Sequence, residues 1–165
     1  MELDAREFRH ALGQFATGVA IVTACVDGHR LGATISSFNS VSLEPPLVLF
    51  SMGRHSLGFE AWKKASAYCI AVLGEAQQDL SNRFAKAGTD KWQGLPEAWA
   101  DNGAPLVPGA LAYFECEPHE VCAGGDHDVF ICRVTRFRVQ EPGGASLIFF
   151  AGRYRQLQAL DEAAS

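Results

Sequence analysis

The sequence predicts a mainly β domain whose strands close into a barrel, with a few helices at its periphery. Three observations predict this fold class. About seven short runs are rich in β-branched and aromatic side chains. Glycine- or proline-containing turn signals separate most of these runs over short distances. Helical periodicity is confined to a few short stretches, and strands joined by hairpins bury their apolar faces by closing into a barrel.

Length and composition limit the class of protein. A chain of 165 residues suits one domain, which we place at 1–165. Hydrophobic residues make up 48% and charged residues 20%, as in ordinary globular proteins. The net charge is -5 without a basic tract, and no apolar run approaches the roughly 20 residues of a membrane helix. We therefore expect no nucleic-acid or membrane partner, and the charged N-terminus predicts a cytoplasmic protein.

The first elements are a helix and a hairpin. Asp4 can cap a helix from Ala5 to about Phe15. An apolar, β-branched strand follows over Gly18–Val26. Asp27-Gly28 is a hairpin turn signal, so residues 31–36 are expected to return antiparallel.

The stretch from 32 to 51 starts as a strand, becomes a hydroxyl-rich loop, and resumes as a strand after Pro45-Pro46. The polar side chains of this loop are Thr34, Ser36, Ser37, Asn39, Ser40 and Ser42. Donors and acceptors between two apolar strands can wrap a polar heteroaromatic ligand. Alternatively, these hydroxyls only cap turns and satisfy their own backbone.

The middle of the chain alternates short elements and then loses its pattern. Ser56 can cap a short helix that runs through Lys64, residues 67–73 form a strand, and residues 77–85 form a helix. From Lys86 to Gly109 no periodicity is visible. A long excursion of this kind in a compact domain is often functional.

The last third holds strands separated by turns. The predicted strands are 110–122 (kinked at Pro118), 128–140 and 146–151. Turns are expected at 123–127 and over Glu141–Gly144, and a short polar tail follows residue 157.

The five cysteines form no CxxC pair, and three of them, Cys25, Cys69 and Cys132, sit in apolar runs as small buried hydrophobes. The spacing Cys116-x-x-His119-x-x-Cys122 invites a zinc interpretation. On one continuous strand, however, the two cysteines would face one side and His119 the other, unless Pro118 breaks the alternation. We therefore expect no metal.

Polar clusters elsewhere mark candidate ligand contacts. His127, after the turn residues Gly125 and Asp126, can bond a ligand carboxamide or phosphate, or only cap the turn. Arg83 can bind a phosphate or complement its helix dipole. Two further candidates are a turn with Ser51, Gly53 and Ser56, whose backbone N–H groups can bind an anion, and Tyr154, which can stack on a flat ring or simply pack. Nucleophile-elbow, P-loop and GxGxxG motifs are missing, which disfavours hydrolase, kinase and Rossmann dehydrogenase functions.

Several segments in a characteristic order resemble the flavin reductase domain family, the FMN-binding split-barrel reductases that feed two-component monooxygenases. They span a core of about 8–155 and are 8–23, 33–48, Leu80–Ala85, Gly125–His127 and Phe150–Tyr154. The resemblance implies a split β-barrel with Greek-key topology, usually as a homodimer. Two departures are Ser36, where many relatives have Asn, and Cys132, where glycine is common.

The resemblance also implies roles for individual residues. The isoalloxazine ring would lie against Thr34, Ile35, Ser36 and Ser37. Ser51, Ser56 and Arg83 would contact the ribityl chain and phosphate, and Tyr154 would lie near the ring. Met52, Gly53 and Phe84 would be further cofactor contacts. Gly125, Asp126 and His127 would line the nicotinamide site, and His127 would position the nicotinamide.

The implied activity is hydride transfer from NADH or NADPH to FMN or FAD, with reduced flavin supplied to a separate monooxygenase. Two alternatives stay open. One is a non-enzymatic flavin-binding or sensor protein on the same barrel. The other is an oxidase acting on a phosphorylated pyridoxine-type ligand.

Overall fold

A computed structural model describes residues 3–140 and 143–160; the predicted turn at Glu141–Gly144 therefore lies partly outside the described residues. The helical segments are α1 (Ala5–Leu12), α2 (Phe59–Lys64), the 3-10 turn η1 (Glu75–Gln77) and α3 (Gln78–Ala85). The strands are β1 (Thr17–Gly18), β2 (Ala20–Val26), β3 (His29–Ile35), β4 (Asn39–Leu43), β5 (Pro46–Gly53), β6 (Tyr68–Val72), β7 (Ala112–Gly124), β8 (His127–Val139), β9 (Ile148–Phe150) and β10 (Arg153–Arg155).

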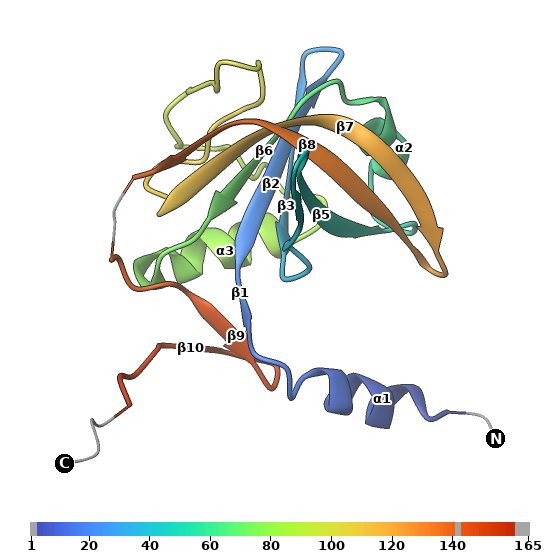
Figure 1. Ribbon diagram of the computed structural model, residues 1–165, viewed down its shortest axis with the longest axis vertical. Helices are drawn as coiled ribbons and strands as arrows, with labels where there is room; N and C mark the ends of the chain where they lie inside the picture. Colours follow the sequence, from blue (N-terminus) through green and yellow to red (C-terminus); the bar gives the residue numbers. More distant parts are fainter. Residues whose placement is uncertain (1–2, 141–142, 161–165) are drawn as a thin grey trace.

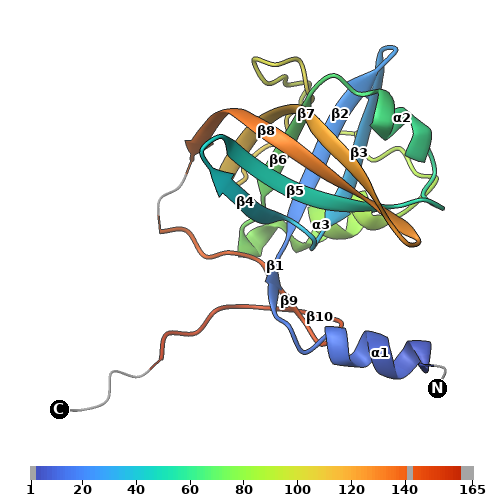
Figure 2. The same ribbon diagram turned by 45° about the vertical axis from the view of Figure 1, so that its right-hand side comes forward.

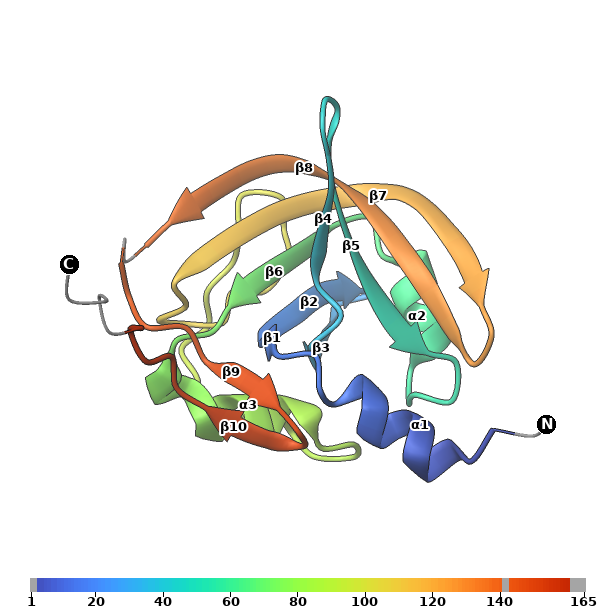
Figure 3. The ribbon, with the colours of Figure 1, turned by 60° about the horizontal axis from the view of Figure 1, so that its bottom comes forward.

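The described strands form two antiparallel sheets (Figure 1). The main sheet has seven strands in the order β3-β2-β6-β7-β8-β5-β4, and β1, β9 and β10 form a small second sheet. Figure 3 shows the main sheet strongly curved, with β3 and β4 at its two edges. This confirms the mainly β, antiparallel fold. Among the described residues no ladder joins β3 to β4, so closure of the barrel stays a prediction.

The N-terminal elements follow the sequence signals closely. The Asp4 carboxylate accepts hydrogen bonds from the N–H groups of Arg6 and Glu7, at 2.8 and 2.9 Å, and so caps α1. The helix ends at Leu12, three residues earlier than predicted. Figure 2 shows α1 beside the small sheet and away from the main one. Asp27 and Gly28 both have positive φ, and β2 and β3 pair antiparallel around them, as predicted.

Three sequence predictions were wrong. Residues 39–43 are not loop but strand β4, because their backbone pairs with β5 while their side chains stay largely exposed, as an edge strand allows. Helix α2 starts at Phe59 after Gly58, not after Ser56, whose carbonyl accepts the Phe59 N–H. Residues 153–155, where the last predicted strand had already ended and the chain was expected to lead into the polar tail, also form a strand, which pairs with β9.

The core lies on both faces of the central strands. One cluster, with Val22, Phe50 and Phe130, also includes Phe59 and Trp62 of α2. The other, with Ile21 and Leu147, packs under α3 and the long segment from 86 to 111. Strands β2 and β6 contribute to both clusters, which explains their unbroken apolar runs.

The long segment, which we predicted to lack regular structure, contains no helix or strand among its described residues. Two of its residues, Lys91 and Trp92, reach the free edge of β3. There the Trp92 indole N–H donates to the Arg30 carbonyl at 3.3 Å, and the Lys91 ammonium donates to the Gly32 carbonyl at 2.8 Å. Two alternate edge carbonyls of β3 are therefore satisfied by side chains.

Candidate functional site

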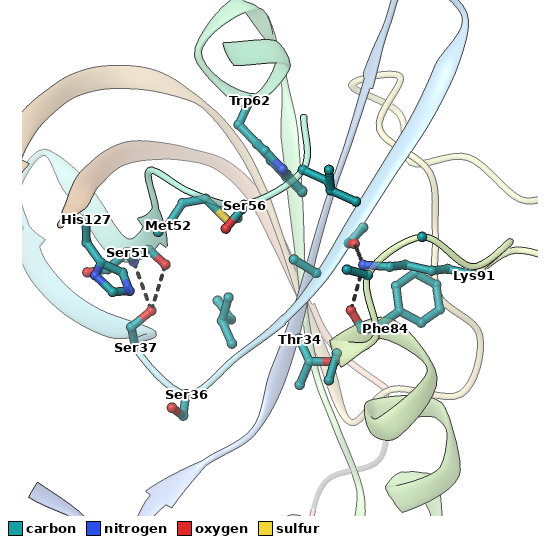
Figure 4. A pocket seen from close by; sticks show the side chains of 18 residues that line it. Thr34, Ser36, Ser37, Ser51, Met52, Ser56, Trp62, Phe84, Lys91 and His127 are labelled. Atoms are coloured by element: carbon teal, nitrogen blue, oxygen red, sulfur yellow. Dashed lines mark hydrogen bonds between the residues drawn. The ribbon is translucent and has the colours of Figure 1, made fainter. Parts of the chain in front are cut away.

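A cavity of about 430 Å³ opens between β3, the end of β5 and the segment after α3 (Figure 4). This volume suits a small organic ligand. The lining residues are Gly32, Ala33, Thr34, Ile35, Ser36, Ser37, Ser51, Met52, Gly53, Ser56, Leu57, Trp62, Phe84, Ala85, Ala87, Gly88, Lys91 and His127. Ten residues that the sequence marked as cofactor or nicotinamide contacts are among them.

The hydroxyls on β3 and just after it have different partners. Thr34 Oγ1 donates to the Ser81 carbonyl at 2.6 Å and so ties the strand to α3. Ser37 Oγ accepts the Ser51 N–H at 2.9 Å. For Ser36, which is exposed, the described residues offer no hydrogen bond. Thr34 and Ser37 therefore brace the cavity wall, as the structural interpretation of the loop predicts, whereas a ligand contact of the Ser36 hydroxyl stays a prediction.

His127 stands at one end of the cavity. It pairs with Gly53 across the β5–β8 ladder, and its Nδ1 lies 2.7 Å from the Asp126 carboxylate. This hydrogen bond to His127 lowers the pKa of Asp126 below its ordinary value. A carboxylate partner favours the proton on Nδ1, so Nε2 is left without one. Nε2 points toward Gly53: a Cβ added to that glycine would lie 3.5 Å from it. The free nitrogen of the ring thus faces the cavity wall.

Lys91 stands at the other end of the cavity, and the sequence did not single it out. Its ammonium donates to the carbonyls of Gly32 and Phe84, at 2.8 and 2.9 Å. Burial lowers its pKa. No carboxylate of the described residues lies within salt-bridge distance of it. One of its three N–H donors therefore remains for a ligand, and its charge is not compensated by the protein.

Apolar side chains form the rest of the wall. Met52 and Trp62 are buried beside the cavity, and the Phe84 ring packs edge-to-face on Trp92 at 5.0 Å. Flat apolar walls, a few hydroxyls and backbone groups, and a cation at one end suit a planar heteroaromatic ligand with an anionic tail. The residues present therefore fit a phosphorylated flavin.

Four of the residues marked in the sequence lie outside the cavity lining. The Arg83 guanidinium donates to the Gln93 carbonyl at 3.0 Å and lines a separate surface hollow. The Tyr154 hydroxyl lies 2.7 Å from Ser81 Oγ, beneath α3. Gly125 and Asp126 form the β7–β8 turn, and Asp126 reaches the cavity only through His127. Their proposed ligand contacts stay predictions.

In residues 3–140 and 143–160, no three His, Cys, Asp or Glu side chains gather as metal ligands; Cys116 is buried in the core. Within the same ranges, no helix is long and apolar enough to span a membrane.

Comparison with known proteins gives consistent similarities. The model of the flavin reductase like domain matches residues 12–158. A flavin reductase of Pseudomonas putida is 38% identical, with 96% of this chain and 93% of that protein covered. The HsaB reductase subunit of a flavin-dependent monooxygenase from Rhodococcus jostii is also 38% identical, over 94% of this chain and 80% of that protein.

Solved structures agree. The NADH:FAD oxidoreductase of Streptomyces globisporus, solved in complex with NAD and FAD fragments, is 31% identical to this chain. It superposes with a TM-score of 0.90, and the alignment covers 98% of this chain and all of that one.

Proposed function

This chain belongs to the flavin reductase-like domain family, and from that premise we propose that it transfers hydride from NADH or NADPH to FMN or FAD. The reduced flavin is supplied to a separate monooxygenase component. The observation that carries this proposal is the cavity, which joins most of the predicted flavin-contact residues to His127.

In the proposed mechanism the protein orients two ligands. The flavin, when bound, supplies the redox chemistry. The β3 wall, with Thr34, Ile35, Ser36 and Ser37, would hold the ring, and Met52 and Trp62 would keep water from its apolar side. Ser51 and Ser56 would meet the ribityl chain. No side chain has to move a proton for the hydride transfer itself.

His127 would position the nicotinamide. Its Nδ1–H is held by Asp126, so a neutral ring presents Nε2 as an acceptor, suited to a carboxamide N–H. Replacement of His127 with Ala is therefore expected to raise KM for NADH more than it weakens flavin binding. Equal effects on both would contradict this role.

Lys91 would bind the flavin phosphate, a role that sequence reasoning gave to Arg83. Its spare donor and uncompensated charge at the end of the cavity support this assignment. Arg83 remains a candidate for a more distant phosphate of FAD, because it lies on the neighbouring hollow.

A homodimer and a cytoplasmic location are further parts of the proposal. Large apolar side chains on α1 and the segment after it, Phe8, Leu12 and Phe15, are 54 to 79% exposed, and a second copy would cover them. The five cysteines are free thiols, as a reducing compartment favours.

One assay tests the function. Purified protein is mixed with NADH and with FMN, FAD or riboflavin in turn, and NADH loss is followed by absorbance. We expect flavin-dependent oxidation. If neither NADH nor NADPH is oxidised with any of the flavins, the non-enzymatic binding protein is favoured. Oxygen uptake with a phosphorylated pyridoxine in the absence of NADH would favour the oxidase.

A further inference from the structure

Asp128 is a buried carboxylate that the proposed mechanism does not use. Its side chain is 9% exposed and follows the inward alternation of β8, on the same side as Phe130. An ionised carboxylate in such a place requires a charged hydrogen-bond partner. Arg54 supplies it, because the guanidinium Nε donates to Asp128 Oδ1 at 2.7 Å. Neither residue lines the cavity.

Arg54 contacts the chain on both sides of His127. Its backbone N–H donates to the carbonyl of Asp126 at 2.9 Å, and its side chain binds Asp128. His127, between these two contacts, pairs with Gly53, the residue before Arg54. One arginine therefore links the turn after β5 to the β7–β8 turn at the residues that flank the histidine.

The same contacts determine where the imidazole lies. Asp126, whose carbonyl is held by Arg54, also provides the carboxylate that receives His127 Nδ1–H at 2.7 Å. If the β7–β8 turn shifted relative to β5, both the Asp126 carboxylate and the pairing of His127 with Gly53 would shift with it. The turn residues Gly125 and Asp126 are exposed, so apart from the strand pairings of His127 with Gly53 and Gly124, few contacts hold this turn.

We propose that Arg54 is a positioning residue for His127, acting through its ion pair with Asp128. This inference rests on the proposed function, in which His127 places the nicotinamide. Arg54 touches neither ligand; it keeps the ring nitrogen aligned with the cavity wall at Gly53. Its loss affects the nicotinamide more than the flavin, because Ser37, Ser51 and Lys91 are held by other bonds.

The test compares Arg54→Met with Arg133→Met. Arg133 lies on β8, and its side chain is as exposed as that of Arg54. It forms an ion pair with the exposed Glu117 and does not line the cavity. We expect Arg54→Met to raise KM for NADH about five- to tenfold, with a change in the flavin Kd of less than about twofold. Arg133→Met leaves both unchanged, and Arg54→Lys restores part of the lost nicotinamide affinity.

Leaving Asp128 charged and unpaired can unfold Arg54→Met. The double variant Arg54→Met/Asp128→Asn removes that charge and is expected to show the same rise in KM. The proposal is overturned if the folded variants raise KM for NADH no more than Arg133→Met does, or if they weaken flavin binding by the same factor.

A second readout separates this inference from the proposed function. In ¹⁵N NMR of the imidazoles, the wild-type His127 ring is expected to carry its proton on Nδ1, and the Arg54 variants to show a mixture of tautomers. If wild type lacks NADH oxidation, the proposed function fails, yet this spectrum still reports whether Arg54 orients the ring. An unchanged ring in the Arg54 variants overturns the inference.

Discussion

The Ser37 side chain is bonded to both backbone polar groups of Ser51. Ser37 Oγ accepts the Ser51 N–H at 2.9 Å and donates to the Ser51 carbonyl at 3.4 Å. The bond joins the chain just after β3 to β5, two walls of the same cavity. The shape of the cavity therefore depends on the Ser37 hydroxyl through these two bonds.

Replacement of Ser37 with Ala tests that dependence. It leaves the Ser51 N–H without its partner, so we expect a loss of about 1 kcal/mol in the free energy of unfolding. Flavin affinity, measured by fluorescence titration, should fall with it. Ser42→Ala is the matched control, because Ser42 Oγ accepts only the exposed Glu44 N–H. An equal loss of flavin affinity in the control would contradict the role of Ser37.

Gly53→Ala probes the space beside His127. The new methyl would lie 3.4 Å from Ser56 Oγ and 3.5 Å from His127 Nε2, which are ordinary contacts, so the fold should be retained. The methyl would nevertheless screen the free ring nitrogen. We expect KM for NADH to rise about three- to tenfold in steady-state kinetics, as for loss of one hydrogen bond. Gly18→Ala, where the Cβ meets nothing within 4 Å, should leave KM unchanged.

Gly32→Ala should damage stability first. Its Cβ would come within 2.4 Å of Phe84 Cε1, and the Phe84 ring is buried against Trp92. Overpacking of this kind costs about 1–3 kcal/mol. Thermal unfolding should show a lowered Tm, and the double variant Gly32→Ala/Phe84→Leu should recover part of it. If the single variant has the same Tm as wild type, the Phe84 ring can move aside at no cost in stability.

We expect the preference for FMN over riboflavin to depend on pH through the charge of Lys91. Burial lowers the pKa of Lys91 below its ordinary 10.5, so its charge is lost at a lower pH than that of an exposed lysine. The preference for FMN over riboflavin, about tenfold by our estimate for a charge-assisted bond, should be complete below that lowered pKa and disappear as pH rises through it. Lys91→Met should show no preference at any pH, whereas Lys86→Met, outside the cavity lining, should behave as wild type.

The stability effect of Lys91 has the opposite sign. Between the lowered folded-state pKa and 10.5, the unfolded chain binds more protons than the folded one. The free energy of unfolding contributed by Lys91 therefore rises with pH in that window. Chemical denaturation at several pH values, with Lys91→Met as reference, checks this. A contribution that falls with pH would mean that the cation gains a partner on folding.

Elements that are stabilised by hydrogen bonds between residues close in sequence were predicted from short sequence motifs. Asp4 caps α1 and Asp27-Gly28 turns the first hairpin, because each acts within three residues of itself. Strand β4 was missed for the opposite reason. Its serines resemble a loop, and only pairing with β5 makes Asn39–Leu43 extended.

The candidate site divides in the same way. Residues 34–37 and residues 51–53 each lie on one short continuous stretch of chain at the end of a strand. Their common place at the cavity was therefore predictable. Lys91 reaches Gly32 across 59 positions of sequence, and no spacing rule connects them. The phosphate contact of Arg83 was expected from its guanidinium group and from the family resemblance. The direction of its side chain instead depends on the carbonyl of Gln93 in the irregular segment. That segment was recognised as unusual, but its contacts were not predictable from its composition.

The side chains of Lys91 and Trp92 donate hydrogen bonds to backbone carbonyls of the edge strand β3. An uncovered edge is a template for pairing with another chain, and here the cover is the same segment that borders the ligand cavity. If this segment moved and the cavity widened, the backbone carbonyls at the edge of β3 would therefore become exposed. Bound flavin, by keeping the segment in place, should also protect the protein from aggregation.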